Sequence, residues 1–217
     1  MYSFVNAKAV KPYKSFCSDK MNQLKITLSN NYDIDCDFEL IGSGARNIVT
    51  KNENAPFDLD YNIVIHSMPN EFRNNLKCLK DTIRNELNEI LGNSHFRDAQ
   101  DSTSVLTARL FFTDDSQKKE FSFDIAILAK DKNGNFCRLI HKKGDNERFY
   151  WNEVPQSHNV EKRASKLKEY GWWEDVRETY LELKNTYLKQ NDHNHPSFIV
   201  YVEAINQVYN EFENYEE

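Results

Sequence analysis

The stretch that decides the fold is Phe57-Asp58-Leu59-Asp60-Tyr61-Asn62-Ile63-Val64-Ile65, in which apolar and polar residues first alternate before an apolar run follows. Alternation is typical of a β-strand with one polar face, and the apolar run predicts burial on both faces. On such a strand Asp58 and Asp60 project to the same face. Like charges that close repel each other, and Mg²⁺ relieves the repulsion because it prefers carboxylate oxygens as ligands.

A third acid interrupts another apolar strand pattern. Asp124 lies within the segment EFSFDIAIL at residues 120–128. A carboxylate buried without a partner is costly, so its place among apolar neighbours indicates a specific role. If the two strands are adjacent, Asp124 joins Asp58 and Asp60, and the three acids would hold two Mg²⁺ ions for an in-line displacement at phosphorus.

A glycine-rich turn precedes these strands. Gly42-Ser43-Gly44 follows a short strand pattern at residues 38–41. Glycines let the backbone approach a polyphosphate, and successive N–H groups cradle its oxygens. The Ser43 hydroxyl would donate to a terminal phosphate, and a helix starting near Ala45 would add the positive end of its dipole. Arg46 is placed to bind phosphate or, equally, to form a salt bridge.

The remaining patterns predict an α+β fold. We expect helices over 13–30 and 69–91, strands over 38–41, 58–65, 104–113 and 120–128, and edge strands over 135–140 and 147–151. The polar link 114–119 predicts an antiparallel hairpin. Beyond Pro155 the pattern turns helical, at about 158–170, 172–190 and 196–213. We therefore expect a catalytic domain at residues 1–154, with a mixed sheet flanked by helices, and a C-terminal helical subdomain at residues 155–217 packed on it.

The order of these motifs resembles the DNA polymerase beta-like nucleotidyltransferase superfamily. Its signature is a hydrophobic residue, Gly-Ser, a spacer, and Asp-hydrophobic-Asp leading into an apolar strand, as in Ile41-Gly42-Ser43 and Asp58-Leu59-Asp60. The stretch 42–46 is similar to the GSxAR form of minimal and antibiotic-modifying members. The resemblance covers residues 36–128. It departs at Asn47, where Gly is usual, at Phe57, where Ser is common, and in a slightly long spacer.

The resemblance implies a nucleotidyltransferase-type fold and an enzyme that moves an NMP from an NTP to an acceptor hydroxyl, releasing pyrophosphate. It implies that Asp58, Asp60 and Asp124 bind two Mg²⁺ ions, with Mn²⁺ as an alternative, and that Asp124 helps to activate the acceptor. The acceptor stays open between a small molecule, a tRNA or other RNA end, a protein side chain and a second nucleotide.

The same resemblance assigns the NTP site. Gly42, Ser43 and Arg46 would bind the triphosphate. In similar enzymes a helix after the catalytic sheet supplies a lysine to the triphosphate, which points to Lys162 or Lys166, although a solvated basic face is the simpler interpretation of either.

The amino-acid composition limits which classes of fold and function are possible. The chain has 217 residues, 39% of them hydrophobic, which is enough for a core. A net charge of -6 argues against broad adhesion to nucleic acid or to an anionic membrane. The four cysteines form no CxxC pair, and neither a signal segment nor a membrane span is apparent. We expect reduced thiols and a soluble, cytoplasmic protein.

Other features favour structural roles. Arg109, on the strand before Asp124, faces either the same cleft or the other side. The Asp192–His195 loop has two histidines but no partner cluster, and Trp172-Trp173 is more typical of a helical core than of base stacking. Two further functions stay open. One is a non-catalytic nucleotide- or partner-binding regulatory module, and the other is a metal-dependent nuclease, which leaves the Gly-Ser turn unexplained.

Overall fold

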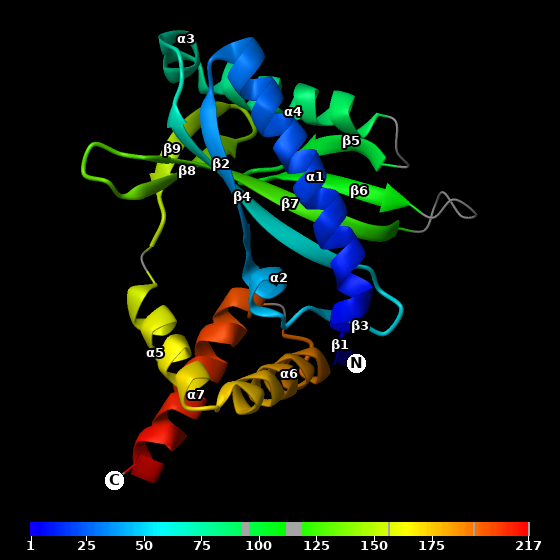
Figure 1. Ribbon diagram of the computed structural model, residues 1–217, viewed down its shortest axis with the longest axis vertical. Helices are drawn as coiled ribbons and strands as arrows, with labels where there is room; N and C mark the ends of the chain where they lie inside the picture. The colour runs from blue at the N-terminus through cyan, green and yellow to red at the C-terminus, as the bar shows by residue number, and fades with distance from the viewer. Residues whose placement is uncertain (93–95, 112–118, 156, 193, 217) are drawn as a thin grey trace. The chain divides into compact units, whose positions relative to one another are not determined.

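The computed structural model describes residues 1–92, 96–111, 119–155, 157–192 and 194–216, and Figure 1 shows its ribbon. The chain forms two compact units. The sheet unit comprises Asn6–Val49 and Pro56–Val154, and the helical unit comprises Met1–Val5, Thr50–Ala55 and Pro155–Glu217. The predicted packing of residues 155–217 on the preceding domain stays a prediction.

A seven-stranded mixed sheet forms the centre of the sheet unit. Its main path runs β2 (Asp35–Ile41), β4 (Phe57–Ser67), β7 (Lys119–Lys130), β6 (Leu106–Phe111) and β5 (Phe96–Asp101). The strand β8 (Phe136–Lys142) pairs with the end of β7, and β9 (Arg148–Glu153) pairs with β8. Only the β4–β7 pair is parallel among these described pairings. The predicted mixed sheet and the antiparallel pairing of β6 with β7 are therefore confirmed.

Helices cover one face of this sheet. The long helix α1 (Ala7–Tyr32) packs beside α4 (Leu76–Leu91), as Figure 1 shows. The side chain of Asn6 accepts a hydrogen bond from the Lys8 backbone N–H and caps α1. Helix α1 thus begins earlier than predicted and contains Pro12 in its second turn.

The predicted helix over 69–91 is wrong as a continuous element. It divides into α3 (Asn70–Asn74) and α4, because Asn75 leaves the helical region at φ -136° and ψ 83°. The Asn75 side chain accepts from the Cys78 backbone N–H and starts α4 anew. Asparagine is suited to this cap, since its short side chain competes with the helical backbone for hydrogen bonds.

Aromatic packing fixes which face of the sheet is buried under α1. Phe57 pairs with Phe121 across β4 and β7, and Leu59 pairs with Phe123. The Tyr13 ring of α1 lies 5.2 Å from the Phe57 ring and 4.7 Å from the Phe121 ring, between centroids. Each such side chain contributes roughly 1.5–3 kcal/mol when fully buried. Residues that alternate with this set therefore project to the opposite face.

The helical unit combines α5 (His158–Glu169), α6 (Trp173–Lys189) and α7 (Ser197–Glu216) with a two-stranded sheet. In that sheet β1 (Tyr2–Phe4) pairs antiparallel with β3 (Thr50–Asn52), two strands that the sequence did not predict. The Tyr2 backbone N–H donates to Asn185 Oδ1 at 2.7 Å and ties β1 to α6. No helix in the described part of the chain has the length and apolar character needed to cross a membrane.

Candidate active site

The carboxylates of β4 lie on the polar face of that strand. Phe57, Leu59 and Tyr61 are buried, whereas Asp58 is exposed and Asp60 is half-buried. The alternation predicted for β4 is therefore present, and both carboxylates project to the sheet face opposite α1.

Strand β7 places a third carboxylate beside this pair. Asp124 is the register partner of Asp60, and Ser122 is the register partner of Asp58. Residues paired in this way on neighbouring strands project to the same face. The buried Ser122 hydroxyl donates a hydrogen bond to Asp58 Oδ1. Asp58, Asp60 and Asp124 thus occupy one patch of the sheet, which we call the carboxylate patch.

The electrostatics of the patch are visible at Asp60. The pKa of Asp60 is raised to about 6, first by burial and then by the negative charges of Asp124 and Asp58. The positive charges of Arg138 and Arg46 oppose this rise. Carboxylates this close together repel one another when they are ionised, so a bound cation would stabilise the ionised form of the patch.

The predicted glycine-rich turn packs directly on the patch. Helix α2 (Gly42–Arg46) follows β2 without a break, so the short helix begins at Gly42 and not near Ala45 as expected. Gly42 has φ +62°, and a Cβ atom there would lie 2.7 Å from Asp60 Oδ2. Only glycine fits this position, because any side chain would be strained and would collide with the carboxylate.

Asn47 explains one departure from the family signature. It ends α2 in the left-handed conformation, with φ +58°. Glycine is the most common residue in this conformation, and asparagine is one of the few other residues that adopt it readily. Lys14 of α1 supports the same turn: its Nζ lies 2.6 Å from the Gly44 carbonyl oxygen and 3.0 Å from Asn47 Oδ1. The loss of glycine at this position therefore does not distinguish an active site from a degenerate one.

The donor chemistry of the patch fits Mg²⁺. Its side chains offer oxygen ligands, which hard divalent cations prefer. Asn62, two residues beyond Asp60 on the same face, has a buried Oδ1 without a hydrogen-bond partner among the described residues. Within those residues, no group of three or more His, Cys, Asp or Glu side chains is already spaced to hold a metal ion. Binding one ion through all three acids therefore requires side-chain rotation, which the exposed Asp58 permits.

The position of Arg109 is resolved by register. Arg109 of β6 pairs with Ser122 of β7, so it projects to the carboxylate face. Its guanidinium donates to Gln100 of β5. Ser122 and Arg138 are not among the predicted site residues, although Ser122 follows from the same two-residue period that places Asp58 and Asp60 together.

The predicted lysines lie in the helical unit. Lys162 is exposed on α5, and Lys166 on the same helix lies 4.7 Å from the centroid of the Phe212 ring. Their role at a triphosphate stays a prediction. Trp172 contacts Phe212 at 5.8 Å between ring centroids, as expected of a helical core. His195 stacks on the Tyr187 ring at 3.9 Å, and His193 lies outside the described residues.

The sequence of the chain matches no protein-family model and no curated protein. Its structure is similar to solved structures at low identity. Vibrio cholerae DncV, a cyclic AMP-GMP synthase in complex with the linear intermediate 5' pppA(3',5')pG, is 14% identical, with a TM-score of 0.56 over 81% of this chain and 47% of that chain. Escherichia coli MS115-1 CdnC with ATP is 14% identical, with a TM-score of 0.54 over 94% of this chain and 62% of that chain.

A third similar structure is Escherichia coli DncV in its 3'-deoxy GTP bound form. It is 16% identical, with a TM-score of 0.53 over 80% of this chain and 46% of that chain. The chain has a nucleotidyltransferase fold. This chain spans about half the length of the DncV proteins it matches. The nucleotidyltransferase fold expected from the strand order is thus confirmed, and the carboxylate patch and the Gly-Ser turn lie within it.

Proposed function

We propose that the chain is a metal-dependent nucleotidyltransferase that moves an NMP from an NTP to an acceptor hydroxyl and releases pyrophosphate. The observation that carries the proposal is the parallel register of Asp60 with Asp124, next to Asp58 on the same face. Carboxylates that converge on one face of a nucleotidyltransferase fold, against a glycine-rich turn, suit a reaction in which the protein mainly positions groups and neutralises charge.

Different residues of the candidate site would bind the metal ions, bind the triphosphate and accept the proton. Asp58 and Asp60 would hold the metal ions, and Gly42 and Ser43 would hold the triphosphate through backbone N–H groups and a hydroxyl. Bound Mg²⁺ would supply Lewis-acid stabilisation of the transferred phosphoryl group and of the leaving pyrophosphate. Asp124 would accept the proton of the acceptor hydroxyl as its oxygen forms a bond to the α-phosphorus and the bond to pyrophosphate breaks.

Positive charge near the patch supports the same role. Arg46 and Arg138 both stabilise the ionised form of Asp60. Arg46 ends the helix that begins at the Gly-Ser turn, so it is placed to contact a phosphate held there. Lys162 and Lys166 stay candidates for a triphosphate contact supplied by the helical unit.

A second nucleotide is the acceptor we favour. Among the acceptor classes that the sequence leaves open, it is the one for which the similar structures give support, since one of them is a cyclic AMP-GMP synthase with a linear dinucleotide bound. Further similar structures carry GTP, ATP or 3'-deoxy GTP. The product would then be a linear or cyclic oligonucleotide.

A transfer assay tests the proposal. The full chain is incubated with each α-³²P-labelled NTP and Mg²⁺ or Mn²⁺, alone and with cell extract, and products are separated by chromatography. We expect label transfer with the wild-type protein, its loss in Asp58→Asn/Asp60→Asn, and its retention in Asp145→Asn, which removes an exposed acid elsewhere in the sheet unit. Transfer that persists in the double variant, or no transfer by the wild type under any of these conditions, would contradict the proposal.

A further inference from the structure

A second cavity lies at the other end of β4 from the carboxylate patch. It has a volume of about 380 Å³ and is formed where β4, β7, β8 and β9 end or begin near α3. Its floor is the paired residues Ile65 and Ala129, which alternate with the carboxylates and therefore project to the opposite face. Asp60 and His66 are six residues apart on an extended strand, which is roughly 20 Å. We call this cavity the strand-end pocket.

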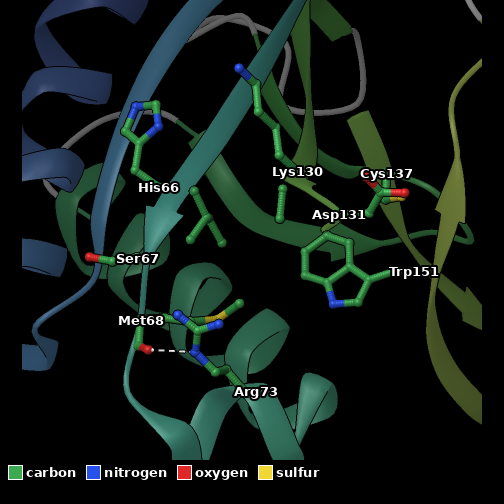
Figure 2. Close-up of a pocket in the computed structure, with 10 residues that line it drawn as sticks. His66, Ser67, Met68, Arg73, Lys130, Asp131, Cys137 and Trp151 are labelled. Carbon is green, nitrogen blue, oxygen red and sulfur yellow. Dashed lines mark hydrogen bonds between the residues drawn. The ribbon is translucent and has the colours of Figure 1, made fainter. Parts of the chain in front are cut away.

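An indole forms one wall of the strand-end pocket. Trp151 of β9 is half-buried and lies beside the floor, as Figure 2 shows. A flat apolar wall over an apolar floor favours a ligand with a planar ring, because a nucleobase stacks well on an indole.

One cation lies beside this wall. Arg73 of α3 is at the rim of the pocket in Figure 2, whereas Lys130 of β7 alternates with the floor residue Ala129 and its ammonium points away from Trp151 and Arg73. The Arg73 Nε donates to the Met68 carbonyl oxygen at 3.0 Å, which holds the guanidinium at the rim, and its two terminal nitrogens form no hydrogen bond within the described residues. The Lys130 ammonium lies 5.1 Å from the centroid of the Phe136 ring, and it forms no ion pair within the described residues.

The other charged residues of the pocket are already engaged. Asp131 Oδ1 accepts the backbone N–H groups of Asn133 and Asn135, so this carboxylate is turned into its own loop. His66 Nε2 lies 2.9 Å from Asp37 Oδ2. Among the described lining residues, Arg73 is therefore the charged group that remains to meet a ligand, and it is positive.

We propose that the strand-end pocket is a second nucleotide-binding site, separate from the carboxylate patch and independent of metal. The base would stack on Trp151 above Ile65 and Ala129. The phosphate would be bound by Arg73, whose planar fork matches phosphate oxygens. Because its floor lies on the opposite face of the sheet, a nucleotide bound there does not compete with one bound at the patch.

The test measures nucleotide binding with the patch disabled. The full chain carrying Asp58→Asn/Asp60→Asn is dialysed against labelled ATP, GTP or AMP in EDTA, with adenosine and inorganic phosphate as separate probes. We expect nucleotides to bind, and adenosine and phosphate each to bind at least tenfold more weakly. Added Arg73→Gln weakens binding roughly tenfold, whereas Lys130→Gln, whose side chain projects to the other face of the sheet, leaves binding unchanged. Lys132→Gln, in the exposed turn of the same hairpin, leaves binding unchanged.

A second variant guards against misfolding. Trp151→Phe keeps an aromatic wall and should retain most binding, whereas Trp151→Leu should lose it; circular dichroism checks that both fold. With Trp172→Phe and Trp173→Phe, Trp151 is the sole tryptophan, and its fluorescence should change on adding nucleotide. No binding by the parent, equal binding by Arg73→Gln and the parent, or equal binding of adenosine and ATP would each overturn the proposal.

Discussion

Gly42 lies so close to Asp60 that a Cβ atom added to it would come within 2.7 Å of the carboxylate oxygen Oδ2. The backbone of the proposed phosphate-binding turn is therefore in contact with a proposed metal ligand. A side chain at position 42 would therefore force the Asp60 carboxylate to shift, because a Cβ atom is not tolerated within 3.0 Å of it. The two halves of the candidate site thus pack directly on each other.

Gly42→Ala should lower both stability and activity. The positive φ alone costs about 1–2 kcal/mol for a residue with a Cβ, and the collision with Asp60 adds to that cost. The matched control is Gly134→Ala, which has φ +85° but would meet nothing within 4 Å, so it carries the backbone strain without the collision. Urea unfolding and label transfer measure both variants. Equal losses of stability and activity in the two variants would rule out the contact as their cause.

The pKa of Asp60, which is raised first by burial and then by the neighbouring carboxylates, predicts that neutralising this residue stabilises the protein in a pH-dependent way. The folded-state pKa of about 6 lies above the ordinary value of 3.8, so the folded state binds more protons between these values and loses stability as pH rises through that window. In EDTA, Asp60→Asn should therefore stabilise the protein relative to wild type by about 2 kcal/mol more at pH 7.5 than at pH 4.5.

Urea unfolding at the two pH values measures this difference, and saturating Mg²⁺ should shrink it because a bound cation relieves the repulsion in the wild type. A stability difference that does not change between pH 4.5 and 7.5 would mean that Asp60 titrates normally. The experiment needs no enzymatic activity, so it examines the electrostatics of the patch separately from the proposed function.

Much of the fold was predictable where the sequence pattern is strong. The strands β4 and β7 combine alternation with an apolar run, and such runs form buried strands in a mixed sheet. The strands β1, β3 and β5 were missed. The first two are three residues long, and β5 has one buried residue, Ala99, so none shows a usable period.

The candidate site was predictable only in part, for similar reasons. Asp58 and Asp60 share a face because of a local two-residue period. The pairing of Asp60 with Asp124 depends on a parallel register between strands far apart in the chain, which no local pattern specifies. Arg138 and Lys14 reach the site from β8 and from α1, and their local sequence carries no signal for it.

A buried ionic cluster predicts which substitutions would strongly destabilise the sheet unit. Lys80 of α4 is 2% exposed, and its Nζ lies 2.6 Å from Asp101 Oδ1. Nδ1 of His141 lies 2.6 Å from Asp101 Oδ2, and its Nε2 lies 2.6 Å from Glu147 Oε1. Removing one partner leaves a buried charge, so Asp101→Ala should cost about 3–5 kcal/mol. The double variant Lys80→Met/Asp101→Leu should recover most of this loss in urea unfolding.

The same cluster sets a direction for acid sensitivity. Burial raises the pKa of Asp101, but hydrogen bonds from Lys80 and His141 outweigh burial and lower the pKa overall. Ionised Asp101 therefore stabilises the fold at pH values above the ordinary pKa of an aspartate. This stabilisation is lost as the pH falls through the lowered pKa of the folded state. Wild type should lose more unfolding free energy between pH 5 and 3 than Asp101→Asn. Parallel pH profiles for the two proteins would show that Asp101 is not held ionised.

Lys14 predicts a positioning effect on nucleotide binding. Its ammonium joins α1 to the Gly44 carbonyl oxygen and to Asn47, and burial lowers its pKa. Lys14→Met should loosen the turn that carries Ser43, raising KM for the NTP severalfold with a smaller effect on kcat, because a hydrogen bond to a charged group contributes about 1.5–3 kcal/mol.

Lys11→Met, at an exposed position one turn earlier on α1, is the matched control and should leave both constants unchanged. Lys14→Arg should bring the KM part of the way back to the wild-type value, because the guanidinium also donates to carbonyl oxygens. If Lys14 contributed only packing, Lys14→Met would keep the wild-type KM. A fall in kcat with KM unchanged would instead place Lys14 among the groups that act in the chemical step. Steady-state kinetics with the preferred NTP separates these outcomes, and thermal unfolding of each variant checks that α1 remains folded.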